Sequence, residues 1–164
     1  MIEEQITLRD AVPEDMQFLG RLYRDSRRRE VESWGWPSEQ QEMFLEMQFH
    51  AQYRSYRASF PDAADSIICQ GDSPIGRVMV SQEPVSLRLI DVALLEEHRC
   101  RGIGGNVIRW LMQRCETNRL TLRLQVLQSN PAMRLYQRLG FVESSADSMY
   151  IQMEWIPSST SEGA

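Results

Sequence analysis

A glycine-rich segment, Arg99-Cys100-Arg101-Gly102-Ile103-Gly104-Gly105, constrains the fold more than any other feature of this sequence. The apolar run before it, residues 85–95, predicts a central β-strand that is covered on both faces. The apolar spacing in residues 103–111 predicts an amphipathic helix behind it. Glycines let the backbone approach a bound phosphate, and the free amides at a helix start stabilise its charge. The pattern therefore predicts an α/β fold with a turn suited to a pyrophosphate.

Three kinds of phosphate-binding loop can be compared with this segment. A dinucleotide-binding fingerprint needs a third glycine where Val107 stands, and this loop follows several predicted strands. A P-loop needs a lysine, whereas all 18 basic residues of the chain are arginine. The acyl-CoA loop, Arg/Gln-x-x-Gly-x-Gly, is satisfied by Arg99, Gly102 and Gly104. A glycine-rich turn without a ligand is the remaining interpretation.

Length and composition limit the classes of protein that this chain can belong to. We expect its 164 residues to form one domain over residues 1–157, with a flexible tail at 158–164. A net charge of -5 argues against binding the nucleic-acid backbone. No apolar run reaches the roughly 20 residues of a membrane helix, and residues 1–4 are unlike a signal peptide, which predicts a cytoplasmic protein. Neither a disulfide nor a metal site is predicted from the cysteine and histidine spacing.

The remaining segments predict further strands and helices around the loop. A strand at Ile6–Arg9 leads into a helix starting near Pro13. A capping-box pattern at Ser38–Gln41 predicts a second helix ending before Pro61. We expect that helix to face inward through a stripe of five residues, Phe44, Met47, Ala51, Ser55 and Ala58. A hairpin follows within residues 66–80, then a strand at 122–126, a helix from Asn130 to Gly140 and a strand at 150–155.

Three segments together resemble the GNAT superfamily of N-acetyltransferases. They are residues 6–15, residues 94–105 and residues 129–141, in the order and approximate spacing of that family. The resemblance implies a mixed, mostly antiparallel central sheet flanked by helices on both faces. It also implies that the sheet splays after the strand at 85–95 to admit pantetheine. The activity implied is direct transfer of an acetyl group from acetyl-CoA to a primary amine of a small molecule or peptide.

The same resemblance implies roles for individual residues in holding coenzyme A. Backbone amides from Arg101 to Gly105 hold the pyrophosphate, Arg99 opens the loop, and the end of the preceding strand offers backbone hydrogen bonds to pantetheine. Asn130 matches an asparagine that contacts the cofactor arm, although it fits equally well as a helix cap. The complete set is Ala93, Leu94, Leu95, Arg99, Arg101, Gly102, Ile103, Gly104, Gly105 and Asn130.

Two residues are predicted to take part in the chemistry. Tyr136 matches the family tyrosine that protonates the departing CoA thiolate, but it could instead be a core tyrosine. Asp91 interrupts an apolar strand and is the leading general base, or else a structural partner for an arginine. The family often has a glutamate where this chain has Arg88, which leaves the base open. The polar residues Glu96, Glu97 and His98 are expected to face solvent.

The amine acceptor is less defined by the sequence. Trp34, Trp36, Tyr53 and Tyr56 could form an aromatic wall and Glu30, Glu32 and Glu39 could attract a cation, although packing explains them equally well. A catalytically silent CoA-binding sensor or interaction module is the main alternative, and a dinucleotide-binding oxidoreductase is a third. The resemblance also leaves a homodimer open.

Overall fold

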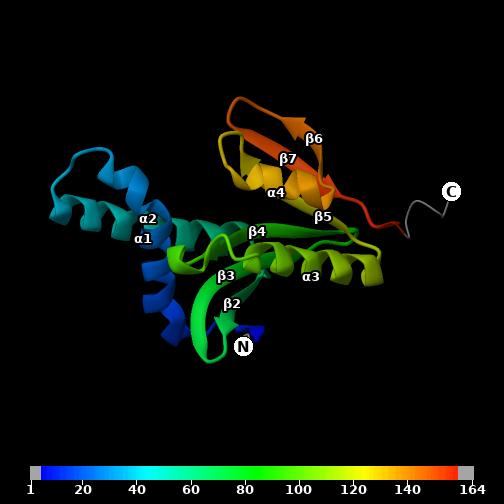
Figure 1. Cartoon of the computed structure of the whole chain (residues 1–164), viewed down its shortest axis with the longest axis horizontal. Helices are drawn as coiled ribbons and strands as arrows, with labels where there is room; N and C mark the ends of the chain where they lie inside the picture. Colours follow the sequence, from blue (N-terminus) through cyan, green and yellow to red (C-terminus); the bar gives the residue numbers. More distant parts are fainter. Residues whose placement is uncertain (1–4, 159–164) are drawn as a thin grey trace. The chain divides into compact units, whose positions relative to one another are not determined.

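The computed structural model describes residues 5–158, and Figure 1 shows its helices and strands. Residues 1–4 and 159–164, which include most of the predicted tail, lie outside the described part. The elements in chain order are β1 (Ile6–Asp10), a 3-10 turn (Pro13–Asp15), α1 (Met16–Glu32), α2 (Ser38–Ser59), β2 (Ala64–Gln70), β3 (Ser73–Gln82), β4 (Ser86–Leu94), a second 3-10 turn (Glu96–His98), α3 (Ile103–Asn118), β5 (Thr121–Leu127), α4 (Ala132–Leu139), β6 (Val142–Ala146) and β7 (Tyr150–Trp155).

The seven strands form one mostly antiparallel sheet in the order β1-β2-β3-β4-β5-β7-β6. β4 is the middle strand, as its apolar sequence predicts, and its partner β5 runs parallel to it. The ladder between these two strands covers only Ser86–Leu89 of β4 and Thr121–Leu124 of β5. β4 continues to Leu94, so its second half extends beyond this ladder. The predicted mixed sheet with a central strand at 85–95 is therefore confirmed.

The chain divides into two compact units. The first contains the residues up to Met79 together with Val92–Arg101, and the second contains Val80–Asp91 together with the residues from Gly102 onward. In the first unit α1 and α2 pack on each other, and a buried cluster joins them to β2. The cluster consists of Leu19, Phe49, Ile67 and Cys69.

The helix predicted after residue 38 is present, but its predicted inward face is wrong. Leu45 and Phe49 are its buried residues, whereas Met47 is 65% exposed. Apolar side chains follow two stripes around this helix, and contact with α1 selects the one that contains Leu45 and Phe49. The predicted capping box is absent too. Instead, the side-chain amide of Gln41 donates to the carbonyl oxygen of Trp36 over 2.7 Å.

The second unit is built on α3, β5 and β7. The inner face of α3 consists of Ile103, Gly105, Val107, Ile108, Leu111 and Cys115. Burial raises the pKa of the Cys115 thiol to about 11, so this thiol stays protonated and acts as a core side chain. Ser158, the last described residue, donates its hydroxyl to Glu116 over 2.6 Å. Ser158 is thus fixed to α3 by this hydrogen bond, whereas the sequence predicted that a flexible tail begins at residue 158.

Asp15 fixes the connection between β1 and α1. Its carboxylate accepts two hydrogen bonds from the Arg9 guanidinium, over 2.8 and 2.9 Å, and one from the amide of Val12 over 2.8 Å. The hydrogen bonds from Arg9 are the main cause of a lowered pKa for Asp15, and the Val12 bond adds to it. The buried Asp15 carboxylate can therefore accept all three hydrogen bonds only when it is charged.

We expect Asp15→Asn to lower the free energy of unfolding at pH 7 by roughly 1–3 kcal/mol, the usual worth of hydrogen bonds to a charged group. A lowered folded-state pKa stabilises the fold above the unfolded pKa, which is about 3.9, and this contribution disappears as the pH falls through the folded value. Urea unfolding of both proteins between pH 7 and pH 3 measures the difference. The difference in unfolding free energy between the two proteins should be constant near neutral pH and should become smaller below about pH 4. A difference that does not depend on pH would contradict this role.

Candidate functional site

The start of α3 has the backbone geometry of an anion site. Gly102 directly precedes the helix with φ +80°, and Cys100 also has a positive φ of 61°. A Cβ on Gly102 would meet no atom within 4 Å, so a side chain would fit there. Glycine is favoured at this position because the backbone is left-handed. The first helical hydrogen bond runs from the amide of Asn106 to the Gly102 carbonyl over 3.0 Å.

The amides of the first helical turn are left open. In the described residues no side chain caps α3, because its N-cap residue is a glycine. Ile103 anchors this turn in the core, whereas Gly104 is half-buried and carries no side chain that would cover the amides. A helix of 16 residues presents its positive dipole end at this turn. These features suit a phosphate or another anion.

In the first unit, the end of β4 is fixed from two sides. The amide of Leu95 donates to the Ile75 carbonyl over 2.8 Å, and the Nε of Arg99 donates to the Leu94 carbonyl over 3.0 Å. A Cβ on Gly76 would lie only 2.4 Å from the carbonyl oxygen of Ala93, so the two strands approach closely there. Arg99 therefore has a structural role at the end of the strand, alongside the role predicted for it in opening the loop.

Helix α1 holds the segment that follows β4. The Asp25 carboxylate accepts the amide of Glu96 over 2.7 Å, and the Arg29 guanidinium pairs with the Glu96 side chain. Glu97 lies 3.8 Å from the guanidinium of Arg21, and Asp25 lies 3.8 Å from that of Arg99. Both glutamates that follow β4 are thus matched by arginines from α1.

His98 was predicted to face solvent, but its side chain is mostly covered. Its side chain is only 18% exposed, and its Nε2 lies 3.7 Å from the Glu97 carboxylate. Its Nδ1 is buried and has no hydrogen-bond partner within residues 5–158. A histidine that follows two glutamates has the sequence pattern of a surface turn, and nothing in that pattern indicates burial.

Tyr136 and Asp91, the two predicted catalytic residues, interact within the second unit. Tyr136 lies on α4 and is 7% exposed, with its ring 5.6 Å from that of Phe141. Burial raises the pKa of its hydroxyl, and the negative charge of Asp91 on β4 raises it further. The phenol therefore keeps its proton at neutral pH and can donate it. Its packing against Phe141 also agrees with the alternative of a core tyrosine.

Arg88, which replaces the family glutamate, has a partner near its own strand. Its Nε donates to the Glu83 carboxylate over 3.1 Å, and the Ser86 hydroxyl donates to the other oxygen over 3.0 Å. The hydrogen bond from Arg88 is the largest cause of the lowered pKa of Glu83. Glu83 is consequently a weak base at neutral pH, and it does not replace the missing glutamate.

Asn130 stands two residues before the helix that carries Tyr136. Its side-chain oxygen accepts the amide of Ala132 over 2.9 Å, but the N-cap residue of α4 is Pro131 and not Asn130 as predicted. The helix ends at Gly140, whose φ of 103° is left-handed as expected for that position. Asn130 keeps a side-chain NH2 group for another partner, and its contact with a cofactor stays a prediction.

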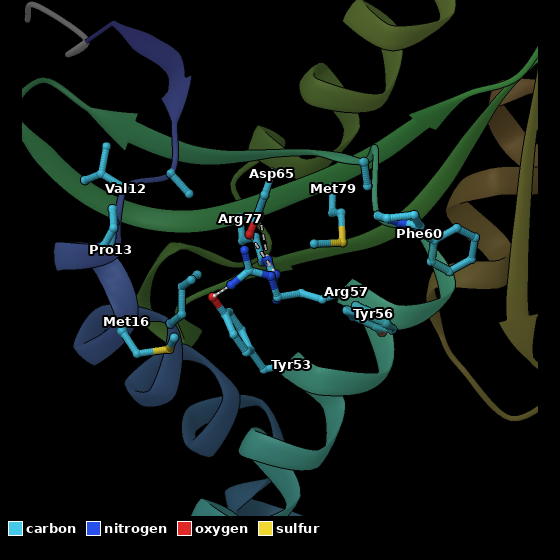
Figure 2. Close-up of a pocket in the computed structure, with 14 residues that line it drawn as sticks. Val12, Pro13, Met16, Tyr53, Tyr56, Arg57, Phe60, Asp65, Arg77 and Met79 are labelled. Atoms are coloured by element: carbon cyan, nitrogen blue, oxygen red, sulfur yellow. Dashed lines mark hydrogen bonds and ion pairs between the residues drawn. The ribbon is translucent and has the colours of Figure 1, made fainter.

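The four aromatic residues predicted to form one wall lie in two places. Trp34 and Trp36 pack on each other at 5.2 Å and on Phe44 at 5.4 and 5.5 Å, all at the connection between α1 and α2. Tyr53 and Tyr56 line a pocket at the other end of α2, which Figure 2 shows. Both tryptophans remain exposed, so they can still contact a ligand.

The part of the chain that the structure describes contains no group of three histidine, cysteine or acidic side chains arranged to hold a metal. None of its helices combines the length and the apolar character of a membrane span.

Comparison with known proteins gives one family and one fold. A model of the acetyltransferase (GNAT) family matches residues 19–141. The PaiA N-acetyltransferase of Thermoplasma acidophilum, solved in complex with coenzyme A, is similar with a TM-score of 0.70 and 18% identity, over 93% of this chain and 99% of that one. A comparison with curated proteins finds no match.

Two further solved structures have the same fold. A ribosomal-protein-alanine N-acetyltransferase from Escherichia coli has a TM-score of 0.63 and 15% identity, over 98% of this chain and 99% of that chain. A chimeric spermidine N-acetyltransferase from Vibrio cholerae SpeG and hSSAT has a TM-score of 0.66 and 20% identity, over 96% and 99%. At these identities the likeness shows the fold alone.

Proposed function

Because this chain belongs to the acetyltransferase (GNAT) family, we propose that it transfers an acetyl group from acetyl-CoA directly to a primary amine. The observation that carries the proposal is the uncapped start of α3 behind the left-handed Gly102. A similar structure was solved with coenzyme A, which supports a CoA-type cosubstrate. The absence of lysine leaves this turn to neutralise phosphates with backbone amides and arginines.

The residues proposed to hold acetyl-CoA have different roles. In the second unit, the amides of Ile103, Gly104 and Gly105 bind pyrophosphate oxygens, and the free NH2 group of Asn130 binds the cofactor arm. Gly102 provides the turn that exposes those amides. In the first unit, the backbone of Ala93, Leu94 and Leu95 bonds to pantetheine, and Arg99 and Arg101 begin the loop.

The chemistry requires two proton movements. The neutral amine attacks the thioester carbonyl, the C–S bond of the tetrahedral adduct breaks, and CoA leaves as a thiolate that takes the phenolic proton of Tyr136. The attacking amine loses its own proton to Asp91, directly or through a water molecule. The interaction between Asp91 and Tyr136 supports placing both groups at one reaction centre.

The proposed acceptor is a primary amine on a small molecule or peptide. The net charge of -5 favours the approach of a cationic amine over that of an anion. The names of two similar structures describe acetylation of spermidine and of a ribosomal-protein alanine, which are a polyamine and an amino acid. Trp34 and Trp36 provide exposed aromatic faces that can bind a cation.

The decisive experiment is calorimetric titration of the protein with acetyl-CoA beside a Gly104→Trp variant. The indole would cover the amides at the start of α3, so we expect affinity to fall by about tenfold or more. The matched control is Gln113→Trp, which adds an indole to an exposed position of the same helix and should bind normally. If the unmodified protein fails to bind acetyl-CoA, the proposal is wrong.

Consumption of the thioester then separates an enzyme from a sensor. Acetyl-CoA is incubated with the protein and a panel of polyamines, amino-acid amides and peptides, and release of the free thiol is measured. Thiol release that depends on one class of amine supports the transferase. Tight acetyl-CoA binding without turnover on any amine would favour the silent CoA-binding module.

A further inference from the structure

The first unit contains a pocket of about 350 Å³ at one end of the α1–α2 pair. Its lining comes from the β1–α1 connection, the start of α1, the last turns of α2, and strands β2 and β3 (Figure 2). The volume lies within the usual range for small-molecule sites, roughly 300–1,000 Å³. None of its lining residues belongs to the segments proposed to hold acetyl-CoA.

The walls of the pocket are mostly apolar and partly aromatic. Leu19 and Met79 are buried and form its inner surface, and Met16 lies half-buried beside them. Tyr53 and Tyr56 come from one face of α2, and Phe60 follows directly after this helix. Aromatic rings and flexible thioethers adapt well to a flat apolar ligand.

The charged side chains that line the pocket include a matched pair of opposite charges. Arg77 is 3% exposed, and its guanidinium donates two hydrogen bonds of 2.8 Å to the Asp65 carboxylate. The Tyr56 ring lies 5.9 Å from the same guanidinium. A bidentate pair of this kind is stable in a buried position because each charge offsets the other.

Arg57 adds a positive charge that no carboxylate offsets. Within residues 5–158 its guanidinium forms no ion pair, and it donates a 2.6 Å hydrogen bond to the Tyr53 hydroxyl. It also lies 5.2 Å above the Tyr53 ring, and Figure 2 shows both side chains reaching into the pocket from α2. Since the Tyr53 oxygen accepts this bond, its own hydrogen stays available to a ligand.

Together, Arg57 and Tyr53 offer an anion several N–H donors and one O–H donor beside an apolar wall. We infer that this pocket binds a small organic carboxylate with a flat apolar body, such as an aryl-acetic acid. The carboxylate bonds to Arg57 and Tyr53, and the body packs against Met16, Met79 and Tyr56. The same charge disfavours a cationic amine, so the pocket is a ligand site separate in chemistry from the proposed amine acceptor.

Calorimetric titration of the whole protein, without acetyl-CoA, tests the inference with three probes of similar shape. They are phenylacetate, the neutral 2-phenylethanol and the cationic 2-phenylethylamine. We expect saturable binding of phenylacetate and at least about tenfold weaker binding of the other two, because only the anion makes charge-assisted hydrogen bonds. Equal binding of the alcohol, stronger binding of the amine, or no saturable binding of phenylacetate would overturn it.

Two variants and a matched control assign the binding to these residues. Arg57→Gln should weaken phenylacetate binding about tenfold or more, and Tyr53→Phe should weaken it by a smaller factor. Arg54→Gln removes an exposed arginine outside the pocket lining and should change nothing. Unchanged affinity in both pocket variants would refute the assignment. The titration contains no acetyl-CoA, so its failure would leave the proposed acetyl transfer untouched.

Discussion

Replacing Tyr136 with phenylalanine is expected to lower kcat about a hundredfold or more, within the usual range for loss of a general acid or base. The ring stays packed against Phe141, and only the hydroxyl is removed. CoA must then leave as a thiolate without receiving a proton from Tyr136. The affinity for acetyl-CoA should not change, because the proposed binding contacts lie elsewhere. Steady-state kinetics with a reactive amine, together with calorimetry, separate the two quantities.

The pH profile provides an independent readout for Tyr136. Burial and the charge of Asp91 raise the pKa of its hydroxyl, so the acid form is present throughout the neutral range and is lost only at strongly alkaline pH. The unmodified enzyme should lose activity there, and Tyr136→Phe should lack that decline. Tyr150→Phe removes a phenol hydroxyl from β7 and should leave the rate unchanged. If Tyr136→Phe retains full turnover, Tyr136 is a core residue only.

A second large effect is expected from Gly76→Ala. The added Cβ would lie 2.4 Å from the Ala93 carbonyl oxygen and 2.8 Å from the Leu94 side chain, so backbone must move. Such overpacking costs about 2–3 kcal/mol, which would lower the melting temperature of a chain of this size by roughly 5–10 °C. Because Ala93 and Leu94 are proposed to bind pantetheine, acetyl-CoA affinity should fall with stability.

Thermal unfolding and acetyl-CoA titration of Gly76→Ala test both effects. Gly20→Ala is the control, since its Cβ would meet its nearest neighbours, Arg24 and Phe49, at 3.4 Å in the middle of a helix. That change should be neutral or slightly stabilising, because alanine favours helix over glycine by about 1 kcal/mol. If the Gly76→Ala protein has the same melting temperature as the unmodified one, β3 and β4 can move apart near Ala93 at little cost in free energy.

The sequence predicted the part of the fold that depends on local patterns. The central strand, the glycine-rich turn and the helix that follows it are consecutive in the chain, so the residue types of one segment indicate all three. Gly140 ends α4 for the same reason, because a single residue decides whether the backbone can turn left-handed there. The family match agrees with these local patterns.

The sequence could not predict what depends on distant contacts. Residues of α2 allow two apolar stripes, and only packing against α1 selects Leu45 and Phe49. His98 is half-buried because of the residues packed around it, although its neighbours in the chain are acidic. In the pocket, Arg77 meets Asp65 across two strands, and no spacing along the chain indicates that pair. The recurrence of Tyr53, Tyr56 and Phe60 at helical spacing was the one available signal.

The use of arginine instead of lysine in the ion pairs of this protein makes them resistant to acetylation by the proposed cosubstrate. Acetyl-CoA acetylates exposed lysine amines spontaneously and removes their charge, whereas a guanidinium stays protonated and is a poor nucleophile. The pairs Arg9–Asp15, Arg77–Asp65 and Arg29–Glu96 therefore keep their charge in the presence of the thioester. Since the sequence contains no lysine, the protein's own side chains contribute no acetylated amine to a reaction mixture.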